Sequence, residues 1–106
     1  MTTATFNYLD NDFISFEIKG HANYATKGID IVCSAITTAT FYTIGLFQKL
    51  FKDSYIYQEN DALIKLTVKE TINQELVKPI IQNFIDVLDN IQKQYPNNLK
   101  INIAKK

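Results

Sequence analysis

One short segment of the chain holds the residue types that could carry chemistry. Residues 20–33 read GHANYATKGIDIVC and contain the only histidine, His21, and the only cysteine, Cys33. In cysteine hydrolases the thiolate attacks a carbonyl carbon while an imidazole moves the protons. The segment therefore indicates either a loop that brings His21 to Cys33 or a chance grouping of two scarce residues.

The position of Cys33 in its element bears on its reactivity. We expect Asp30 to be the N-cap of a helix that starts at Ile31, which places Cys33 in the first turn. Unpaired backbone N–H groups and the helix dipole would favour a negative sulfur there, and the same groups could bind an oxyanion. Asp30 has a second candidate role, in which its carboxylate orients His21 and favours the charged imidazole. It cannot fill both roles at full strength, and we favour the cap.

Two glycines, Gly20 and Gly28, stand at the two ends of the loop that carries His21. Glycine adopts backbone angles that other residues resist, so both positions could act as hinges of a closing loop.

Other chemistries fit the segment less well. A cysteine in an apolar helix is often a small buried hydrophobe, which would make Cys33 structural. A zinc site would need three or four ligands, so we expect no metal. A serine nucleophile at Ser34 or Ser15 would lack the usual G-x-S-x-G elbow, and a redox sensor at Cys33 would lack a resolving cysteine.

The rest of the sequence predicts the elements that position this segment. Alternating apolar residues predict strands over 2–9, 13–19, 55–58, 63–69 and 99–103. Helical spacing predicts a helix over 31–51, buried on most sides, and a second over 74–94. Pro79 in the second indicates a start near this proline or a kink. The order β-β-α-β-β-α-β predicts an α+β two-layer domain with both helices on one face of a mostly antiparallel sheet.

The helical spacing also predicts which residues face the core. In the first helix the expected main stripe is Val32, Ala35, Ala39, Tyr42, Leu46 and Leu50, widened by Ile36, Ile44, Phe47 and Phe51. In the second helix it is Leu76, Ile80, Phe84, Leu88, Ile91 and Tyr95.

Composition limits the class of protein. At 106 residues, the chain is expected to form a single domain over 1–106. Its 11 basic and 11 acidic residues cancel, which argues against direct nucleic-acid binding. We find neither a secretory signal nor an apolar run approaching the ~18 residues of a membrane span, and expect a cytoplasmic protein.

The segment resembles the signature of the ribosomal-processing cysteine protease family, Prp. Gly20-His21-Ala22, Gly28 and the run from Asp30 to Ala35 carry the resemblance, and the predicted element order is similar along nearly the whole chain. The resemblance implies a homodimeric endopeptidase without a cofactor. Its substrate would be the precursor of large-subunit ribosomal protein number twenty-seven, from which it removes a short, apolar, Phe-rich N-terminal extension.

The resemblance also implies roles for individual residues. Cys33 corresponds to the nucleophile, His21 to the histidine and Asp30 to the aspartate of the family. Thr37 and Ser34 stand where the family usually has serine and alanine. Tyr24, with Asn23 and Lys27, is a candidate for substrate contact in the loop, and Phe41, Tyr42 and Phe47 are candidates for an apolar peptide surface or for the core. A non-enzymatic homodimer that binds the ribosome or another partner, with Cys33 in its core, is the alternative.

Overall fold

The structure, a computed structural model, describes residues 1–20 and 27–106, and the side chains of residues 1–20 and 31–106. It has five strands and two helices in the predicted order. The strands are β1 (Thr2–Leu9), β2 (Asp12–Lys19), β3 (Tyr55–Asn60), β4 (Leu63–Val68) and β5 (Leu99–Lys105). The helices are α1 (Lys27–Leu50) and α2 (Gln74–Gln94).

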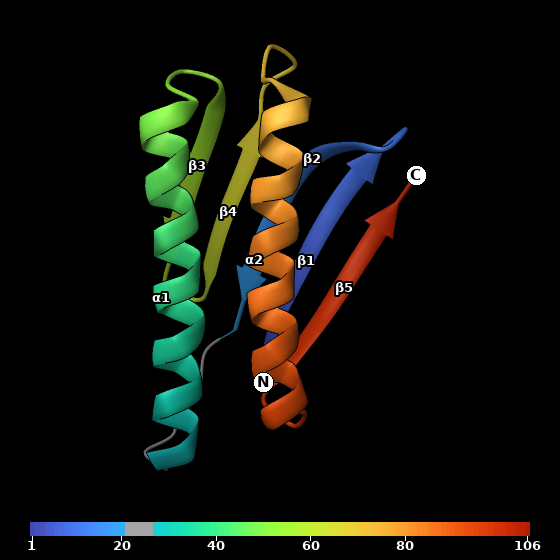
Figure 1. Ribbon diagram of the computed structural model, residues 1–106. Coiled ribbons are helices and arrows are strands. Elements are labelled where there is room, and N and C mark those ends of the chain that lie inside the picture. Colours follow the sequence, from blue (N-terminus) through green and yellow to red (C-terminus); the bar gives the residue numbers. More distant parts are fainter. Residues whose placement is uncertain (21–26) are drawn as a thin grey trace.

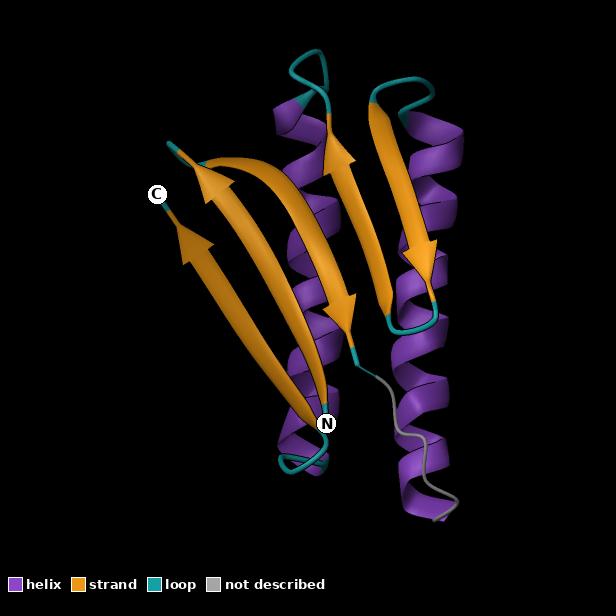
Figure 2. Cartoon of the chain, turned by 180° about the vertical axis from the view of Figure 1, so that it is seen from behind, coloured by secondary structure: helices purple, strands orange, loops and turns teal. Residues whose placement is uncertain are grey.

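The five strands form one sheet in the order β3-β4-β2-β1-β5. All neighbouring pairs are antiparallel except β1 and β5, which are parallel. Both helices lie on the same face of this sheet, and the other face is open (Figures 1 and 2). The predicted two-layer α+β fold is therefore confirmed.

The core lies between the sheet and the helices and is centred on aromatic side chains. The ring of Phe84 from α2 meets those of Phe6 and Phe16 edge-on, at centroid distances of 5.5 and 5.2 Å. All three side chains are buried. Edge-to-face pairs add about 0.5–1.5 kcal/mol each beyond the burial itself, so this cluster fixes α2 on the central strands.

The start of α2 is well defined, and the Pro79 alternatives can be judged against it. Asn73 is the N-cap, and its side-chain oxygen accepts a hydrogen bond from the backbone N–H of Leu76 at 3.2 Å. The helix begins at Gln74 and contains Pro79 within it, so the late-start alternative is wrong. The capping bond and the packing of the following turns offset the hydrogen bond that proline removes.

The two helices bury somewhat different residues from those expected. In the first turns of α2, Val77 and Ile81 are buried, Leu76 is exposed, and Ile80 is only partly buried against the core. In α1, Tyr42 and Leu50 are exposed, so the expectation of a helix buried on most sides is wrong. The buried face of α1 instead includes Thr40 and Thr43, besides Val32 of the expected main stripe and Ile36, Ile44 and Phe47 of the second row.

Backbone hydrogen bonds explain why threonines can lie in the core face of α1. The Thr40 hydroxyl donates to the carbonyl oxygen of Ile36 at 2.7 Å, and the Thr43 hydroxyl donates to that of Ala39 at 2.9 Å. A hydroxyl satisfied by its own helix can be buried without an unpaired polar group.

One stretch of α1 corrects the expectation about membrane spans. Among the described residues, Ile31–Leu50 is long and apolar enough to cross a membrane by length and composition, with a mean hydropathy of 1.4. Threonines interrupt the apolar residues of this stretch, so the sequence shows no continuous apolar run although the mean hydropathy is high. Because α1 contributes side chains to the core and packs against α2, length and composition alone are weak support for a span.

Candidate active site

Cys33 opens into a pocket of about 200 Å³ that four segments of the chain build. The described lining residues are Thr2 of β1, Ile18 and Gly20 at the end of β2, Cys33, Ile36, Thr37 and Phe41 of α1, and residues 59–64 of the β3–β4 hairpin. The Cys33 side chain is half-buried. The pocket therefore gives the Cys33 thiol a partly enclosed space bordered by apolar, hydroxyl and carboxylate side chains.

Three of the lining residues form a row along α1. Cys33, Thr37 and Phe41 follow one another at intervals of four residues and all line the pocket. Residues four apart lie on the same face of a helix. The sequence-predicted residues Cys33 and Thr37 are thus brought together in one pocket.

The helix start differs from the predicted one. Helix α1 begins at Lys27, so the prediction that Asp30 is its N-cap is wrong: Asp30 is a residue of the first turn. Ile29 stands three residues before Val32, so the helical spacing of apolar residues already begins before Asp30. Gly28 belongs to the first turn as well, which places it within the helix and not in a hinge between elements.

The observed start of α1 weakens the expectation that the helix N-terminus favours a Cys33 thiolate. Cys33 lies beyond the first turn of α1, and the influence of unpaired N–H groups and of the helix dipole is greatest within that turn. The N–H groups without a partner inside the helix lie in its first turn, before Cys33. The position of Cys33 in α1 therefore gives weaker support for a thiolate than the predicted helix start did.

Gly20 has a conformational role at the edge of the pocket. Its φ is +89°, and a Cβ atom at this position would lie 2.7 Å from the backbone oxygen of Met1. Its N–H donates to the carbonyl oxygen of Ala62 at 2.8 Å. Glycine is therefore needed here, where it joins the end of β2 to the β3–β4 turn.

His21, Ala22 and Tyr24, together with Asn23, lie outside the described residues. His21 is bonded directly to Gly20, and Gly20 lines the same pocket as Cys33.

A hairpin residue that the sequence did not single out contacts one of the lining residues of the pocket. The Tyr57 hydroxyl on β3 donates a hydrogen bond to Oε1 of Glu59, which lines the pocket. Burial, and after it the hydrogen bond to Glu59 and the charge of that carboxylate, together raise the pKa of Tyr57 to about 12. Tyr57 therefore stays protonated at neutral pH and holds the Glu59 carboxylate in place.

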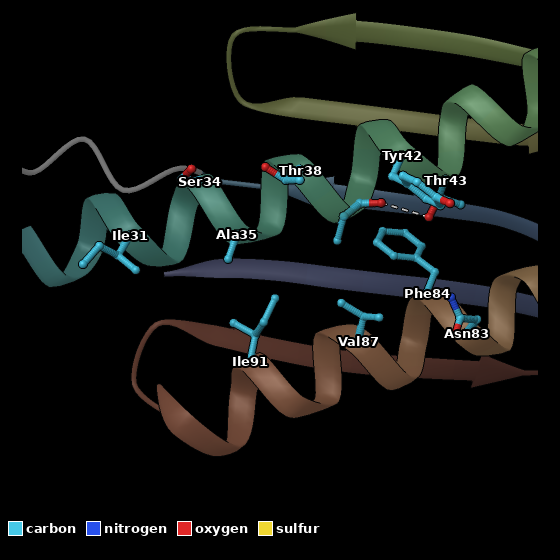
Figure 3. Close-up of a pocket in the computed structure, with 11 residues that line it drawn as sticks. Ile31, Ser34, Ala35, Thr38, Tyr42, Thr43, Asn83, Phe84, Val87 and Ile91 are labelled. Carbon is cyan, nitrogen blue, oxygen red and sulfur yellow. Dashed lines mark hydrogen bonds between the residues drawn. The ribbon is translucent and has the colours of Figure 1, made fainter.

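A second, larger pocket lies between the two helices. It has a volume of about 810 Å³ and lies along α1 and α2 (Figure 3). Ser34, Ala35 and Tyr42 of α1 and Val87 and Ile91 of α2 line it, and Ala35 points toward Ile91 across it. None of its described lining residues is charged. We call this pocket the helix–helix groove; it is where the structure places Ser34.

The three aromatic candidates of α1 separate into three environments. Phe47 belongs to the core, Phe41 lines the Cys33 pocket, and Tyr42 lines the helix–helix groove. Neighbouring positions on a helix point about 100° apart, which explains how Phe41 and Tyr42 reach different pockets.

Sequence reasoning also missed the contribution of the β3–β4 turn. The sequence predicts strands over 55–58 and 63–69, but nothing in a single sequence indicates that the connection between them lies next to Cys33. The pairing of β4 with β2, which brings the turn there, is a long-range contact.

Comparison with known proteins adds relatives along almost the entire chain. The family model described as cysteine protease Prp matches residues 1–100. The chain is 28% identical to the ribosomal processing cysteine protease Prp of Bacillus subtilis over 97 residues, which are 87% of each chain. It is 32% identical to the protein of the same name from Mycoplasma genitalium over 84 residues, which are 79% of this chain and 82% of the relative.

Solved structures share the fold. A Streptococcus mutans protein superposes with a TM-score of 0.83 at 26% identity, covering 100% of this chain and 96% of that one. The Staphylococcus aureus ribosomal processing protease Prp, crystallised with a substrate peptide, gives a TM-score of 0.85 at 20% identity, covering 98% and 100%. At that identity the second likeness concerns the fold.

Proposed function

Because this chain belongs to the cysteine protease Prp family and is therefore a cysteine protease, we propose that Cys33 is its nucleophile and His21 its acid–base partner. The observation that carries the assignment is that Cys33 and Gly20 line one pocket, and that His21 follows Gly20 directly in the chain. A half-buried cysteine in a pocket is also the setting expected of a reactive thiol, whereas a structural cysteine is usually fully buried.

The proposed reaction has two stages. The Cys33 thiolate adds to the scissile carbonyl carbon; the tetrahedral intermediate then collapses, the C–N bond breaks, and protonated His21 gives its proton to the leaving amine. A water molecule then attacks the thioester as His21 takes its proton, which releases the acid and returns the sulfur as a thiolate. The unpaired N–H groups in the first turn of α1 are the candidate donors to the oxyanion.

Two residues of α1 have proposed supporting roles. Asp30 stands three residues before Cys33 on the helix, and its carboxylate would orient His21 and favour the charged imidazole. Thr37 stands one turn after Cys33 and lines the pocket, where its hydroxyl is available to a bound peptide.

We further propose that the substrate is the precursor of large-subunit ribosomal protein number twenty-seven, and that the enzyme removes its N-terminal extension. The names of the two curated relatives support a ribosomal precursor, since both are called ribosomal processing proteases. Ala22 and Tyr24 are proposed loop contacts to this peptide. An enzyme acting on newly made ribosomal protein would work in the cytoplasm.

The test is mass spectrometry of the extended ribosomal protein after incubation with wild type, Cys33→Ala and His21→Ala. We expect wild type to remove one defined N-terminal peptide and both variants to leave the precursor intact. Equal cleavage by the Cys33→Ala variant would exclude the proposed nucleophile. An intact precursor in the presence of folded wild type would exclude this substrate and favour the alternative of a non-enzymatic partner-binding protein.

We also propose that the chain forms a homodimer through the helix–helix groove. The described lining of the groove is uncharged, and Ile31, Tyr42 and Val87 project from it as exposed apolar side chains. A continuous apolar surface of this kind is typical of an interface. The chain has no net charge, so two copies do not repel each other as wholes. In a twofold dimer, Tyr42 of each copy would face the small residues Ala35 and Ala39 of the other.

A further inference from the structure

Phe41 is an exposed aromatic residue in the wall of the pocket that holds the proposed nucleophile. Its side chain is 43% exposed, although most phenylalanines of this chain, among them Phe6, Phe13 and Phe47, are fully buried. Phe41 contributes to the Cys33 pocket and not to the core. An apolar ring left partly in water beside a catalytic group is a candidate contact for a substrate side chain.

The helix sets the distance between Phe41 and the reacting carbonyl. Phe41 comes eight residues after Cys33 on the same face of α1, and a helix rises 1.5 Å per residue, so the two lie roughly 12 Å apart along the axis. An extended peptide advances about 3.3 Å per residue. A peptide lying along this row would therefore place a residue three or four positions from its scissile bond over Phe41.

The surroundings of Phe41 define which side chain would fit. Ile36 and Ile64 supply further apolar surface to the same pocket. The rim carries the carboxylates of Glu59 and Asp61, of which Glu59 is held by the Tyr57 hydroxyl. An apolar side chain would gain contact with the ring and the isoleucines, whereas an acidic side chain would meet two like charges.

We propose that Phe41 forms an apolar specificity subsite of the protease, which binds a large apolar side chain three or four residues from the scissile bond. The inference rests on the proposed function, because the position of the bound side chain is counted from the carbonyl that Cys33 attacks. Phe41 is a binding residue in this account and takes no part in the bond-breaking steps. It gives the enzyme a means to select an apolar cleavage segment by contacts well away from the thiol.

The experiment compares enzyme variants on a series of substrates. Starting from the extended precursor, each residue within five positions of the mapped scissile bond is replaced in turn by alanine and by aspartate, and kcat/KM is measured for every substrate. For wild type we expect the largest loss from alanine, about tenfold or more, at a large apolar residue three or four positions away. Aspartate at this position should be worse than alanine.

The enzyme variants then identify the residue responsible. Phe41→Ala should lose the preference at that position, so that the original and alanine substrates differ by less than about threefold; substitutions on contacting partners are not additive. Phe41→Leu should keep most of the preference. Leu50→Ala is the matched control, because Leu50 is also a half-exposed apolar residue of α1 but lines neither described pocket. It should behave like wild type.

The outcomes distinguish a failure of the Phe41 subsite from a failure of the proposed protease function. If wild type cleaves no substrate, the proposed function itself fails. If wild type cleaves and discriminates, and the folded Phe41→Ala variant shows the same preference at every position, the subsite is wrong. Thermal unfolding of each variant checks that it is folded.

Discussion

At the scale of single residues, two glycines of this chain lie in opposite situations: Gly20 directly follows β2, whereas Gly45 lies inside α1. Gly20 has a positive φ and faces the Met1 backbone, whereas a Cβ atom on Gly45, inside α1, would meet nothing within 4 Å. The sequence predicted that Gly20 matters, as a hinge. The structure gives a different reason, since the strand end and a close backbone contact require it.

The two glycines provide a matched prediction. Gly20→Ala should lower the free energy of unfolding by about 1–3 kcal/mol, because alanine resists this backbone angle and its methyl group meets the Met1 carbonyl. Gly45→Ala should raise it by about 0.5–1 kcal/mol, because alanine is the better helix former. Urea unfolding followed by circular dichroism measures both. An unchanged Gly20→Ala variant would contradict the structural role given to Gly20.

At the scale of the elements, the periodicity of apolar residues predicted the bounds of α2 better than it predicted which residues of α1 are buried. The bounds of α2 match the prediction because its apolar residues recur at helical spacing between clear ends. The buried face of α1 was misjudged because Thr40 and Thr43 count as polar in the sequence but satisfy their hydroxyls within the helix. The start of α1 was misjudged because Asp30 is a good cap residue by type, and residue type does not decide position.

One contact between elements could not be foreseen from the sequence. The side-chain amide of Gln74, at the start of α2, accepts from the backbone N–H of Phe13 and donates to its carbonyl oxygen, both at 2.9 Å. This pair of hydrogen bonds joins α2 to the start of β2, in the way a neighbouring strand would. It fixes the end of the helix layer on the sheet.

Loss of this contact should be measurable. Gln74→Ala should lower the free energy of unfolding by about 1–3 kcal/mol, because it leaves two backbone groups of Phe13 without their partners. Gln82→Ala is the control, because the side chain of Gln82 makes one exposed hydrogen bond to Asp86 in the same helix. It should change the stability by less than about 0.5 kcal/mol. Equal effects in the two variants would argue against the tie between α2 and β2.

At the scale of the whole molecule, the candidate site exists because distant segments meet. Cys33 and the β3–β4 turn are separated by a helix and a strand in sequence, and they become neighbours through the order β3-β4-β2. Strand order and the parallel pairing of β1 with β5 depend on long-range contacts, which local patterns do not encode. The signature residues could be found in the sequence, but not the walls of the pocket around them.

The proposed dimer is also a property of the whole molecule and is directly testable. Tyr42→Arg would bring a charge to each side of an apolar interface, so we expect it to shift the chain from dimer to monomer at micromolar concentration. Leu50→Arg changes an exposed apolar residue of the same helix outside the groove and should leave the dimer intact. Sedimentation velocity distinguishes the two states. A monomeric wild type, or dissociation by both variants alike, would contradict an interface at the groove.

The central claim is that Cys33 forms a covalent intermediate with the substrate, and intact mass spectrometry after rapid acid quenching tests it most directly. Wild type mixed with the extended ribosomal protein should gain the mass of the released N-terminal peptide less one water, and peptide mapping should locate the added mass on Cys33. The Cys33→Ala variant should show no such species and no cleavage. Cleavage by wild type without a detectable adduct, together with full cleavage by Cys33→Ala, would contradict the account.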